Sequence, residues 1–240
     1  MEQKLNYIKE KIAELGIEIQ DSQAMQFYQY YELLVEWNRF MNLTGITEFE
    51  EVVQKHFVDS LSIVFEKKME EVQSLIDVGT GAGFPGLPLK IAFPYIKVTL
   101  LDSLNKRIQF LDEVIRKTGL QEIETIHGRA EDYAKPGLKR EIYDLCVSRA
   151  VANLATLSEY CLPYVKIGGE FIPYKSGKIE QEMAEAKAAI FLLGGKIEGC
   201  KTFTLPNSDI GRSLVRIKKV NGCPKKYPRK SGLPLKSPLH

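Results

Sequence analysis

The chain has 240 residues, of which 44% are hydrophobic and 27% charged, and its formal net charge at pH 7 is +2. This length suits one α/β domain with an appendage, and the composition is that of an ordinary globular protein. The charged start MEQKLNYIKEKIAEL predicts no signal peptide, no apolar run approaches the ~18 residues of a membrane span, and no C-x-x-C pair indicates a zinc site. We therefore expect a cytoplasmic protein with free thiols and no metal.

Residues 1–66 are predicted to form a helical cap of three helices. Apolar residues recur at three- and four-residue spacing over 5–15, and Gly16 is a natural helix end. Asp21 and Ser22 are the predicted caps of a second helix. Thr47 with Glu50 has capping-box spacing ahead of a third helix.

From residue 67 to residue 220 the pattern is that of an α/β domain. Apolar runs of strand length alternate with helix-like stretches, which is typical of βαβ units and a parallel sheet. The predicted strands cover residues 74–78, 96–101, 122–126, 142–148 and 169–174, followed by a late pair at 196–204 and 212–220. The predicted helices cover residues 104–118, 154–165 and 178–193. We predict a Rossmann-like, mainly parallel seven-stranded sheet with an antiparallel last strand.

The last part of the chain, residues 221–240, is predicted to be a basic arm. No acidic residue follows Asp209, whereas nine Lys and Arg residues do, so residues 1–209 carry a net charge of −7. The arm NGCPKKYPRKSGLPLKSPLH holds four prolines and five basic side chains, which oppose a packed element. We expect it to be extended and to meet a polyanion, although a solvated tail is the alternative. The RNA contacts expected here are Lys225, Lys226, Arg229 and Lys230.

A glycine loop, IDVGTGAGFPG (76–86), follows the first predicted strand. Gly79, Gly81 and Gly83 alternate, whereas the dinucleotide pattern requires a glycine at the position of Phe84, and no G-K-[ST] of a P-loop follows. Asp77 would repel a pyrophosphate but suits an ammonium group. S-adenosylmethionine has an amino-acid end and no phosphate, so it fits this loop better than NAD does.

Asp102 ends the second predicted strand, 23 residues after Gly79. A carboxylate at this point can accept both hydroxyls of an adenosine ribose. The alternative is a cap for the helix over 104–118, and the two roles are compatible.

Basic residues follow three successive strands: Arg129, Arg149 and Lys175. Because the carboxyl ends of parallel strands share one edge of the sheet, these cations predict a pocket for an anion such as an RNA phosphate. Ion pairing with nearby acids is the alternative for each of them.

The fourth strand excludes two kinds of methyl transfer. It is followed by Ser148-Arg149-Ala150, not by the N/D-P-P-Y/F/W motif of amino-methylating enzymes, and neither Cys146 nor Cys223 suits the nucleophile of a cytosine-C5 enzyme. A guanine N7 has a free lone pair, so its methylation needs orientation but no general base. For His127 we expect a structural role.

The loop and acids resemble motifs I and II of class I S-adenosylmethionine-dependent methyltransferases. Further stretches make the chain similar to the RsmG family, also called GidB, of bacterial 16S rRNA guanine-N7 methyltransferases: VEWNRFMNLTGIT (35–47), KHFVDSL (55–61), GRAED (128–132), SRAVANL (148–154) and PKKYPRKSGLPLKSP (224–238).

This resemblance implies a monomeric enzyme that methylates N7 of one guanine in the decoding-region hairpin of 16S rRNA, as naked rRNA, an assembly intermediate or the 30S subunit. No catalytic residue is required, and Arg149 is the candidate for positioning the base. The implied cofactor contacts are Gly79, Phe84, Ala130, Glu131 and Arg149, with Asp102 and Ser103 at the ribose.

Three other functions stay open at this point. A small-molecule methyltransferase would act without RNA and without the arm. A non-catalytic RNA-binding or ribosome-assembly factor would bind RNA but not S-adenosylmethionine. A Rossmann oxidoreductase would prefer NAD.

Overall fold

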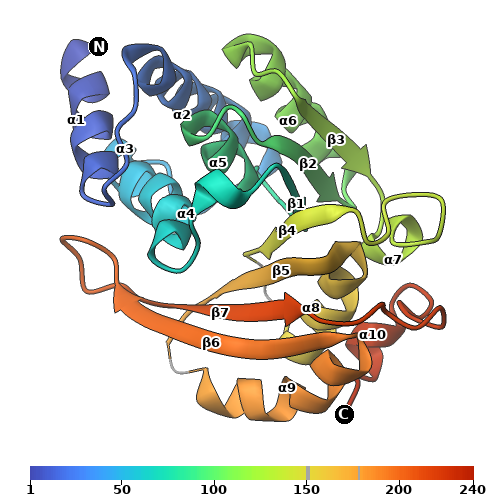
Figure 1. Ribbon diagram of the computed structural model, residues 1–240. Helices are drawn as coiled ribbons and strands as arrows, with labels where there is room; N and C mark the ends of the chain where they lie inside the picture. The colour runs from blue at the N-terminus through green and yellow to red at the C-terminus, as the bar shows by residue number, and fades with distance from the viewer. Residues whose placement is uncertain (150–151, 178) are drawn as a thin grey trace.

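A seven-stranded sheet runs through the centre of the molecule (Figure 1). The computed structural model describes residues 1–149, 152–177 and 179–240. The strand order is β3-β2-β1-β4-β5-β7-β6, with bounds β1 (Ser74–Val78), β2 (Lys97–Asp102), β3 (Ile123–His127), β4 (Tyr143–Ser148), β5 (Val165–Lys175), β6 (Gly195–Thr204) and β7 (Gly211–Lys219). Strands β1 to β5 pair in parallel, and β7 runs antiparallel to β5 and β6. The predicted mainly parallel sheet is confirmed.

Helices cover both faces of the sheet (Figure 1). Successive strand residues point to opposite faces, so Leu75 belongs to one apolar core and Ile76 to the other. The first core is covered by α1 (Glu2–Ala13), α2 (Asp21–Met41), α5 (Gly86–Ala92) and α6 (Asn105–Thr118). The second is covered by α7 (Ala130–Tyr133), α8 (Leu154–Cys161), η4 (Leu162–Tyr164) and α9 (Glu180–Leu192). Burial on both faces explains why the central strands are nearly continuous apolar runs.

The N-terminal helices pack into the first core, but their caps differ from the prediction. Helix α2 begins after Gln20, and the side-chain oxygen of Gln23 accepts the backbone N–H of Gln20 at 2.8 Å. The prediction that Asp21 and Ser22 are the caps is wrong, because both lie inside the helix. Whether residues 1–66, 67–220 and 221–240 act as three separate units stays a prediction.

The third predicted helix is a composite of four short pieces. They are α3 (Phe49–Val52), the π-helix η1 (Val53–Val58), α4 (Asp59–Leu61) and the 3₁₀-helix η2 (Ser62–Phe65); a second 3₁₀ turn, η3 (Met69–Glu71), precedes β1. The predicted capping box at Thr47 is wrong, because the extended Glu48 is the N-cap and makes no side-chain cap bond. A π-helical stretch changes which side chains face inward, and such stretches are frequent at functional sites.

Residues 221–240, here called the C-terminal arm, are packed against the domain, contrary to the expectation of an extended, unpacked arm. Cys223, Tyr227 and Pro234 are buried, and a short helix, α10 (Leu233–Lys236), forms near the end. Buried Arg140 explains the packing of the first half, since its guanidinium donates to the carbonyls of Cys223, Pro224 and Tyr227. A proline has no backbone N–H to donate, and here Arg140 supplies the hydrogen bonds that the backbone carbonyls of the arm accept.

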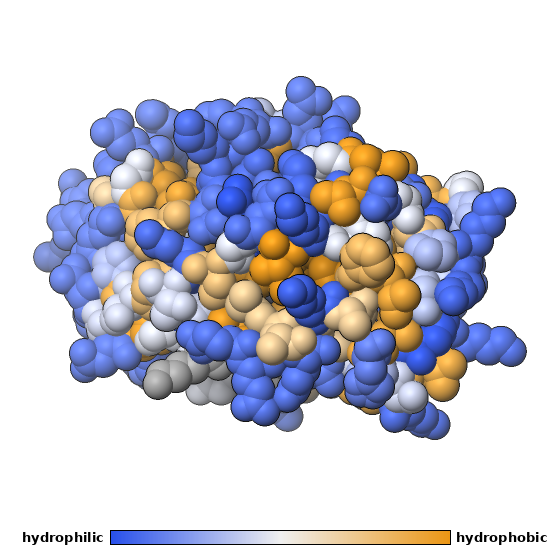
Figure 2. Space-filling view, turned by 60° about the horizontal axis from the view of Figure 1, so that its bottom comes forward, coloured by the Kyte–Doolittle hydropathy of each residue, from blue (hydrophilic) through white to orange (hydrophobic). Residues whose placement is uncertain are grey.

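The surface shows scattered apolar side chains. On the face seen in Figure 2 they form separate groups between hydrophilic ones. The exposed large apolar side chains of the chain include Ile167, Phe191 and Leu235. Scattered exposure of this kind is common in globular proteins. In the described residues, no helix combines the length and apolarity needed to cross a membrane.

Candidate active site

The glycine loop connects β1 to α5 at the carboxyl edge of the sheet. Gly79 and Gly81 have positive φ (74° and 63°), and a Cβ added to either would meet no atom within 4 Å. Gly83 differs, because its Cβ would overlap Leu87 and approach Tyr30 Oη to 2.8 Å. The first two glycines therefore leave open space above the loop, and the third permits close packing beneath it.

Asp77 holds this loop from below. Its Oδ2 accepts the Thr80 hydroxyl at 2.7 Å and the Gly86 N–H at 2.8 Å, while its buried Oδ1 has no hydrogen-bond partner in the described structure. Burial raises the pKa of this carboxyl from 3.8 to about 7. Asp77, which was expected to attract an ammonium group, therefore stabilises the conformation of the loop through Oδ2, while its Oδ1 has no partner in the described structure.

A cavity of about 280 Å³, here called the glycine pocket, opens above the loop. Its lining includes Gly79, Asp102, Ser103, Arg129, Ala130 and Glu131. The structure therefore brings together residues that sequence analysis assigned to the cofactor from three different strand ends. Their arrangement fits S-adenosylmethionine, because open space lies over small residues and carboxylates stand at the edge.

Asp102 lines the glycine pocket, where its contact with the ribose stays a prediction, and it is not the N-cap of α6, because that position is Leu104. Its Oδ1 accepts the N–H of Leu104, the N-cap residue before α6, at 2.9 Å. Its Oδ2 accepts the Gly81 N–H at 2.9 Å and lies 3.2 Å from Arg107 Nη1. The carboxylate therefore fixes the loop and the helix start and also lines the pocket.

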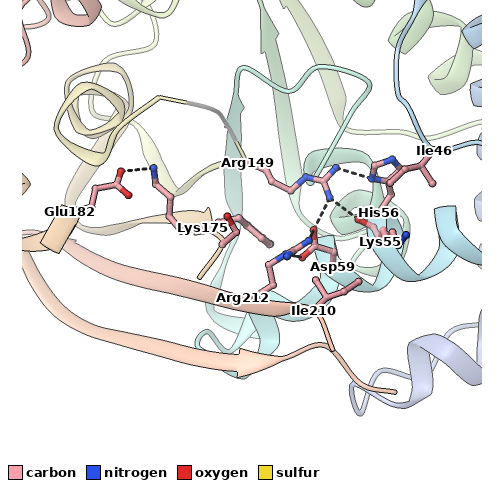
Figure 3. A pocket seen from close by; sticks show the side chains of 11 residues that line it. Ile46, Lys55, His56, Asp59, Arg149, Lys175, Glu182, Ile210 and Arg212 are labelled. Carbon is pink, nitrogen blue, oxygen red and sulfur yellow. Dashed lines mark hydrogen bonds and ion pairs between the residues drawn. The ribbon is translucent and has the colours of Figure 1, made fainter. Parts of the chain in front are cut away.

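A second cavity of about 500 Å³, here called the cationic pocket, lies at the ends of β4 and β5. Figure 3 shows Lys55, Arg149 and Arg212 gathered around Asp59, with Lys175 opposite. Asp59 is buried and accepts Arg149 at 3.0 Å and Arg212 at 2.8 Å. Each of the four cations that line this pocket is paired with an acid: Arg149 and Arg212 share Asp59, Lys175 pairs with Glu182, and Lys55 pairs with Glu51 outside the lining. Because Asp59 is shared by two arginines, the group keeps one excess positive charge, which favours an anionic or electron-rich ligand.

His56 is held neutral in the wall of this pocket. Its Nδ1 lies 3.2 Å from Arg149, and its Nε2 lies 2.9 Å from the Thr44 hydroxyl. Burial and the charge of Arg149 lower the pKa of His56 to about 3. Because arginine can only donate, Nδ1 accepts and Nε2 carries the proton.

Phe84 of the glycine loop packs against two residues of the cationic pocket. Its ring stacks on His56 at 4.4 Å, and the Arg149 guanidinium lies over it at 4.9 Å. Phe84 is 5% exposed and lines neither pocket, so the cofactor contact that the resemblance implies at this residue stays a prediction. Arg149 lines the cationic pocket and not the glycine pocket.

The three cations predicted to form one pocket are divided between the two. Arg149 and Lys175 share the cationic pocket, whereas Arg129 lines the glycine pocket. Lys175 donates to Glu182 at 2.6 Å and to the carbonyl of Ala152 at 2.7 Å. The fourth-strand motif continues into Ala150, which lies outside the described residues.

Sequence analysis missed Lys55, His56, Asp59 and Arg212 as site residues. The first three belong to KHFVDSL, which was used only as part of a resemblance. Lys55 and His56 lie in the π-helix η1, which gives no sequence signal, and Asp59 begins the short helix α4 that follows it. Arg212 was counted only as part of the basic C-terminal charge. In the described residues, His, Cys, Asp and Glu form no cluster of three or more suited to a metal ion.

On the arm, the predicted RNA contacts differ in environment. Lys225, Lys226 and Lys230 are exposed, whereas Arg229 forms a multidentate ion pair with buried Glu159. RNA binding by the lysines stays a prediction, and the guanidinium of Arg229 is already occupied within the chain.

Comparison with known proteins gives one consistent result. The family model GidB, described as rRNA small subunit methyltransferase G, matches residues 23–210. A protein named ribosomal RNA small subunit methyltransferase G from Lachnoclostridium phytofermentans is 57% identical over 225 residues, which cover 94% of this chain and 93% of that protein. Its namesake from Alkaliphilus metalliredigens is 51% identical over 239 residues and is covered along 100% of both chains.

Solved structures agree at the level of the fold. The crystal structure of a SAM-dependent methyltransferase from Aquifex aeolicus has a TM-score of 0.51 and 17% identity, covering 70% of this chain and 92% of that one. At this identity the likeness concerns the fold alone. The predicted class I methyltransferase fold, with its N-terminal helical extension, is confirmed.

Proposed function

Because the chain belongs to the GidB family, rRNA small subunit methyltransferase G, we propose that it methylates N7 of one guanine in the decoding-region hairpin of 16S rRNA, with S-adenosylmethionine as methyl donor. The rRNA methyltransferase activity follows from the family, and relatives sharing half or more of their residues with this chain carry that name. The choice of N7 rests on the chemistry of the cationic pocket.

The glycine pocket supplies the groups that a nucleoside with an amino-acid end requires. Asp102 and Ser103 would hold the ribose hydroxyls, Ala130 and Glu131 would border the adenine, and Gly79 and Gly81 leave room for close approach. Asp77 is buried beneath the loop and does not line this pocket, so its predicted contact with the ammonium group of the cofactor stays a proposal. When bound, S-adenosylmethionine supplies a methyl group on a positively charged sulfur.

The single observation that carries the proposal is the position of Arg149. It stands in the cationic pocket, bound to Asp59 and His56, and lies over Phe84 of the glycine loop. An electron-rich base or a phosphate held by Arg149 would therefore lie next to the methyl donor's loop. Orientation of this kind contributes several kcal/mol, on the order of 7 or more in well-aligned systems.

The side chains of the cationic pocket that could act as a general base are already engaged in hydrogen bonds or ion pairs. His56 is neutral with both ring nitrogens engaged, Asp59 accepts two arginines, and Glu182 accepts Lys175. Methylation at N7 removes no proton from the base in the transfer itself, so it needs none of these groups as a general base. An exocyclic amine would need one. This difference favours N7.

The substrate is tested in cells that lack the gene. Guanine N7 methylation is mapped in 16S rRNA by reduction and aniline strand scission, with purified rRNA and 30S subunits as substrates in vitro. We expect the mark to disappear, to return with the wild-type gene, and to stay absent with Gly79→Arg, which fills the glycine pocket. Gly137→Arg is the matched control, since Gly137 also has positive φ (81°) and open surroundings but lines neither pocket. A mark that persists without the gene contradicts the proposal.

A further inference from the structure

Hydrogen bonds, most of them partly buried, hold the C-terminal arm on the domain along its length. At its start the Cys223 N–H donates to Glu141 Oε1 at 2.6 Å, and Arg140 Nη1 donates to the Tyr227 carbonyl at 2.8 Å. Arg140 also binds the Ala134 carbonyl at 3.0 Å, directly after α7. One guanidinium thus links the arm to the segment that carries Ala130 and Glu131.

The strongest tie is between Arg229 and Glu159 of α8. Glu159 has an exposed fraction of 0%, and its two oxygens accept the Arg229 side chain at 2.9 and 2.6 Å and the Arg229 backbone N–H at 2.8 Å. A carboxylate buried this deeply requires such a partner, because an unpaired buried charge is costly. The guanidinium is therefore committed to the fold of the arm.

Beyond this ion pair the arm reaches the glycine pocket itself. The Gly232 N–H donates to Glu131 Oε1 at 3.0 Å, and the Thr156 hydroxyl donates to the Pro234 carbonyl at 3.1 Å. Glu131 of α7 lines the pocket, and so do Leu157 and Tyr160 of α8. Helix α8 therefore presents one set of side chains to the arm and another to the pocket, and Figure 1 shows α10 beside it.

We propose that the C-terminal arm is part of the S-adenosylmethionine site. Arg229 and Gly232 act as positioning residues: Arg229 anchors the arm on α8, and the Gly232 N–H fixes the carboxylate of Glu131 at the adenine side. This inference rests on the proposed function, because it takes S-adenosylmethionine as the occupant of the glycine pocket. Arg229 and Gly232 of the arm would then position the cofactor site, while the exposed lysines of the arm remain available to RNA.

The test measures cofactor and RNA binding separately in full-length variants. Arg229→Gln removes the charge, and Arg229→Lys keeps it but cannot engage both oxygens of Glu159 as a fork. The matched control is Lys225→Gln with Lys226→Gln, which removes charge from exposed positions of the same arm. Binding of S-adenosylmethionine is measured by calorimetry without RNA, and rRNA binding by filter retention.

We expect Arg229→Gln to raise the Kd for S-adenosylmethionine about tenfold, because a loosened arm would lose the hydrogen bond from the Gly232 N–H to Glu131. The Kd of Arg229→Lys should lie between that of Arg229→Gln and that of the wild type. In turnover assays the KM for S-adenosylmethionine should rise more than kcat falls. The lysine control should leave this Kd unchanged and weaken rRNA binding. A wild-type Kd in a folded Arg229→Gln protein, or an equal rise in the lysine control, overturns the inference.

A second measurement uses the unmodified protein, in case Arg229→Gln does not fold. Hydrogen exchange at the amides of Arg229 and Gly232 is followed with and without S-adenosylmethionine. Slower exchange on binding supports the inference, and unchanged exchange at saturating cofactor overturns it. If the wild-type protein binds no S-adenosylmethionine at all, the proposed function fails as well, so the two failures are distinguishable.

Discussion

Buried Asp77 and half-buried His56 have pKa values that are displaced in opposite directions. The pKa of Asp77 is raised from 3.8 to about 7, so it contributes stability that is full below pH 4 and is lost as pH rises through 7. The pKa of His56 is lowered from 6.5 to about 3, so it contributes stability that is full above pH 6.5 and is lost as pH falls through 3. Between pH 4 and 6.5 the two groups change the free energy of unfolding with pH in opposite directions, so their slopes nearly cancel.

Single substitutions should uncover each contribution. In Asp77→Asn the histidine acts alone, so the free energy of unfolding, relative to wild type, should fall as pH is lowered from 6.5 to 4.5. In His56→Gln it should rise over the same interval, each by up to about 1.4 kcal/mol per pH unit. Urea unfolding at four pH values measures both slopes. Parallel curves for the three proteins would show that neither group is displaced as described.

Asp102 is the residue whose removal should affect cofactor binding most directly. Asp102→Ala removes the expected ribose acceptor and also frees the Gly81 and Leu104 N–H groups that now donate to it. We expect the Kd for S-adenosylmethionine to rise by more than tenfold, because at least two hydrogen bonds change. Calorimetry checks this, with Glu124→Ala as a control carboxylate at the opposite end of the sheet. Wild-type affinity in Asp102→Ala would remove Asp102 from the site.

At the scale of elements, different glycines of the glycine loop serve stability and ligand binding. Gly83→Ala should cost about 3 kcal/mol of unfolding free energy, because its φ is +99° and the new Cβ would overlap Leu87. Gly79→Ala should cost only about 1 kcal/mol, the strain of positive φ alone, but should weaken S-adenosylmethionine binding. Urea unfolding and cofactor titration of both variants distinguish the two roles, and equal stability losses would contradict the assignment.

The elements that sequence analysis predicted well are those whose signal is local. Strand β1 was predicted at 74–78, as found, and the other strands were found within a few residues because buried strands are continuous apolar runs. Caps were predicted less well, since Gln20 and Glu48 occupy positions where Ser, Thr or Asp is preferred. The π-helix η1 has no sequence signature, and it carries His56 into the cationic pocket.

The candidate site shows the same division between local and distant signals. Asp102 was placed because it ends a strand and the carboxyl edge of a parallel sheet is predictable, whereas Glu131 was assigned through the family resemblance. Asp59 could not be placed, because its partners Arg149 and Arg212 lie 90 and 153 residues away in sequence. The docked arm was missed because charge and proline favour an extended segment unless buried partners such as Glu159 exist.

At the scale of the whole molecule, charge is divided between a negative body and a positive end. Residues 1–209 carry a net charge of −7, and the exposed arm lysines project from the docked arm. Reversing Lys225, Lys226 and Lys230 to Glu should weaken rRNA binding and reduce the slope of log K against log salt by about 2 to 3. The cofactor Kd should not change. Binding measured from 50 to 200 mM salt tests this, with Lys196 and Lys201 of β6 reversed as the control, and an unaltered slope would exclude the arm from the RNA surface.

The bonds that join the arm to α8 and Glu131 have a thermodynamic consequence. One segment contacts the cofactor pocket at Gly232 and presents lysines to solvent a few residues earlier, so ligands at the two places act on the same docked state. If rRNA and the cofactor both favour that state, each strengthens the other's binding by the same factor, since linkage is reciprocal. Substrate and methyl donor would then be retained together, and release of one after the transfer would loosen the other.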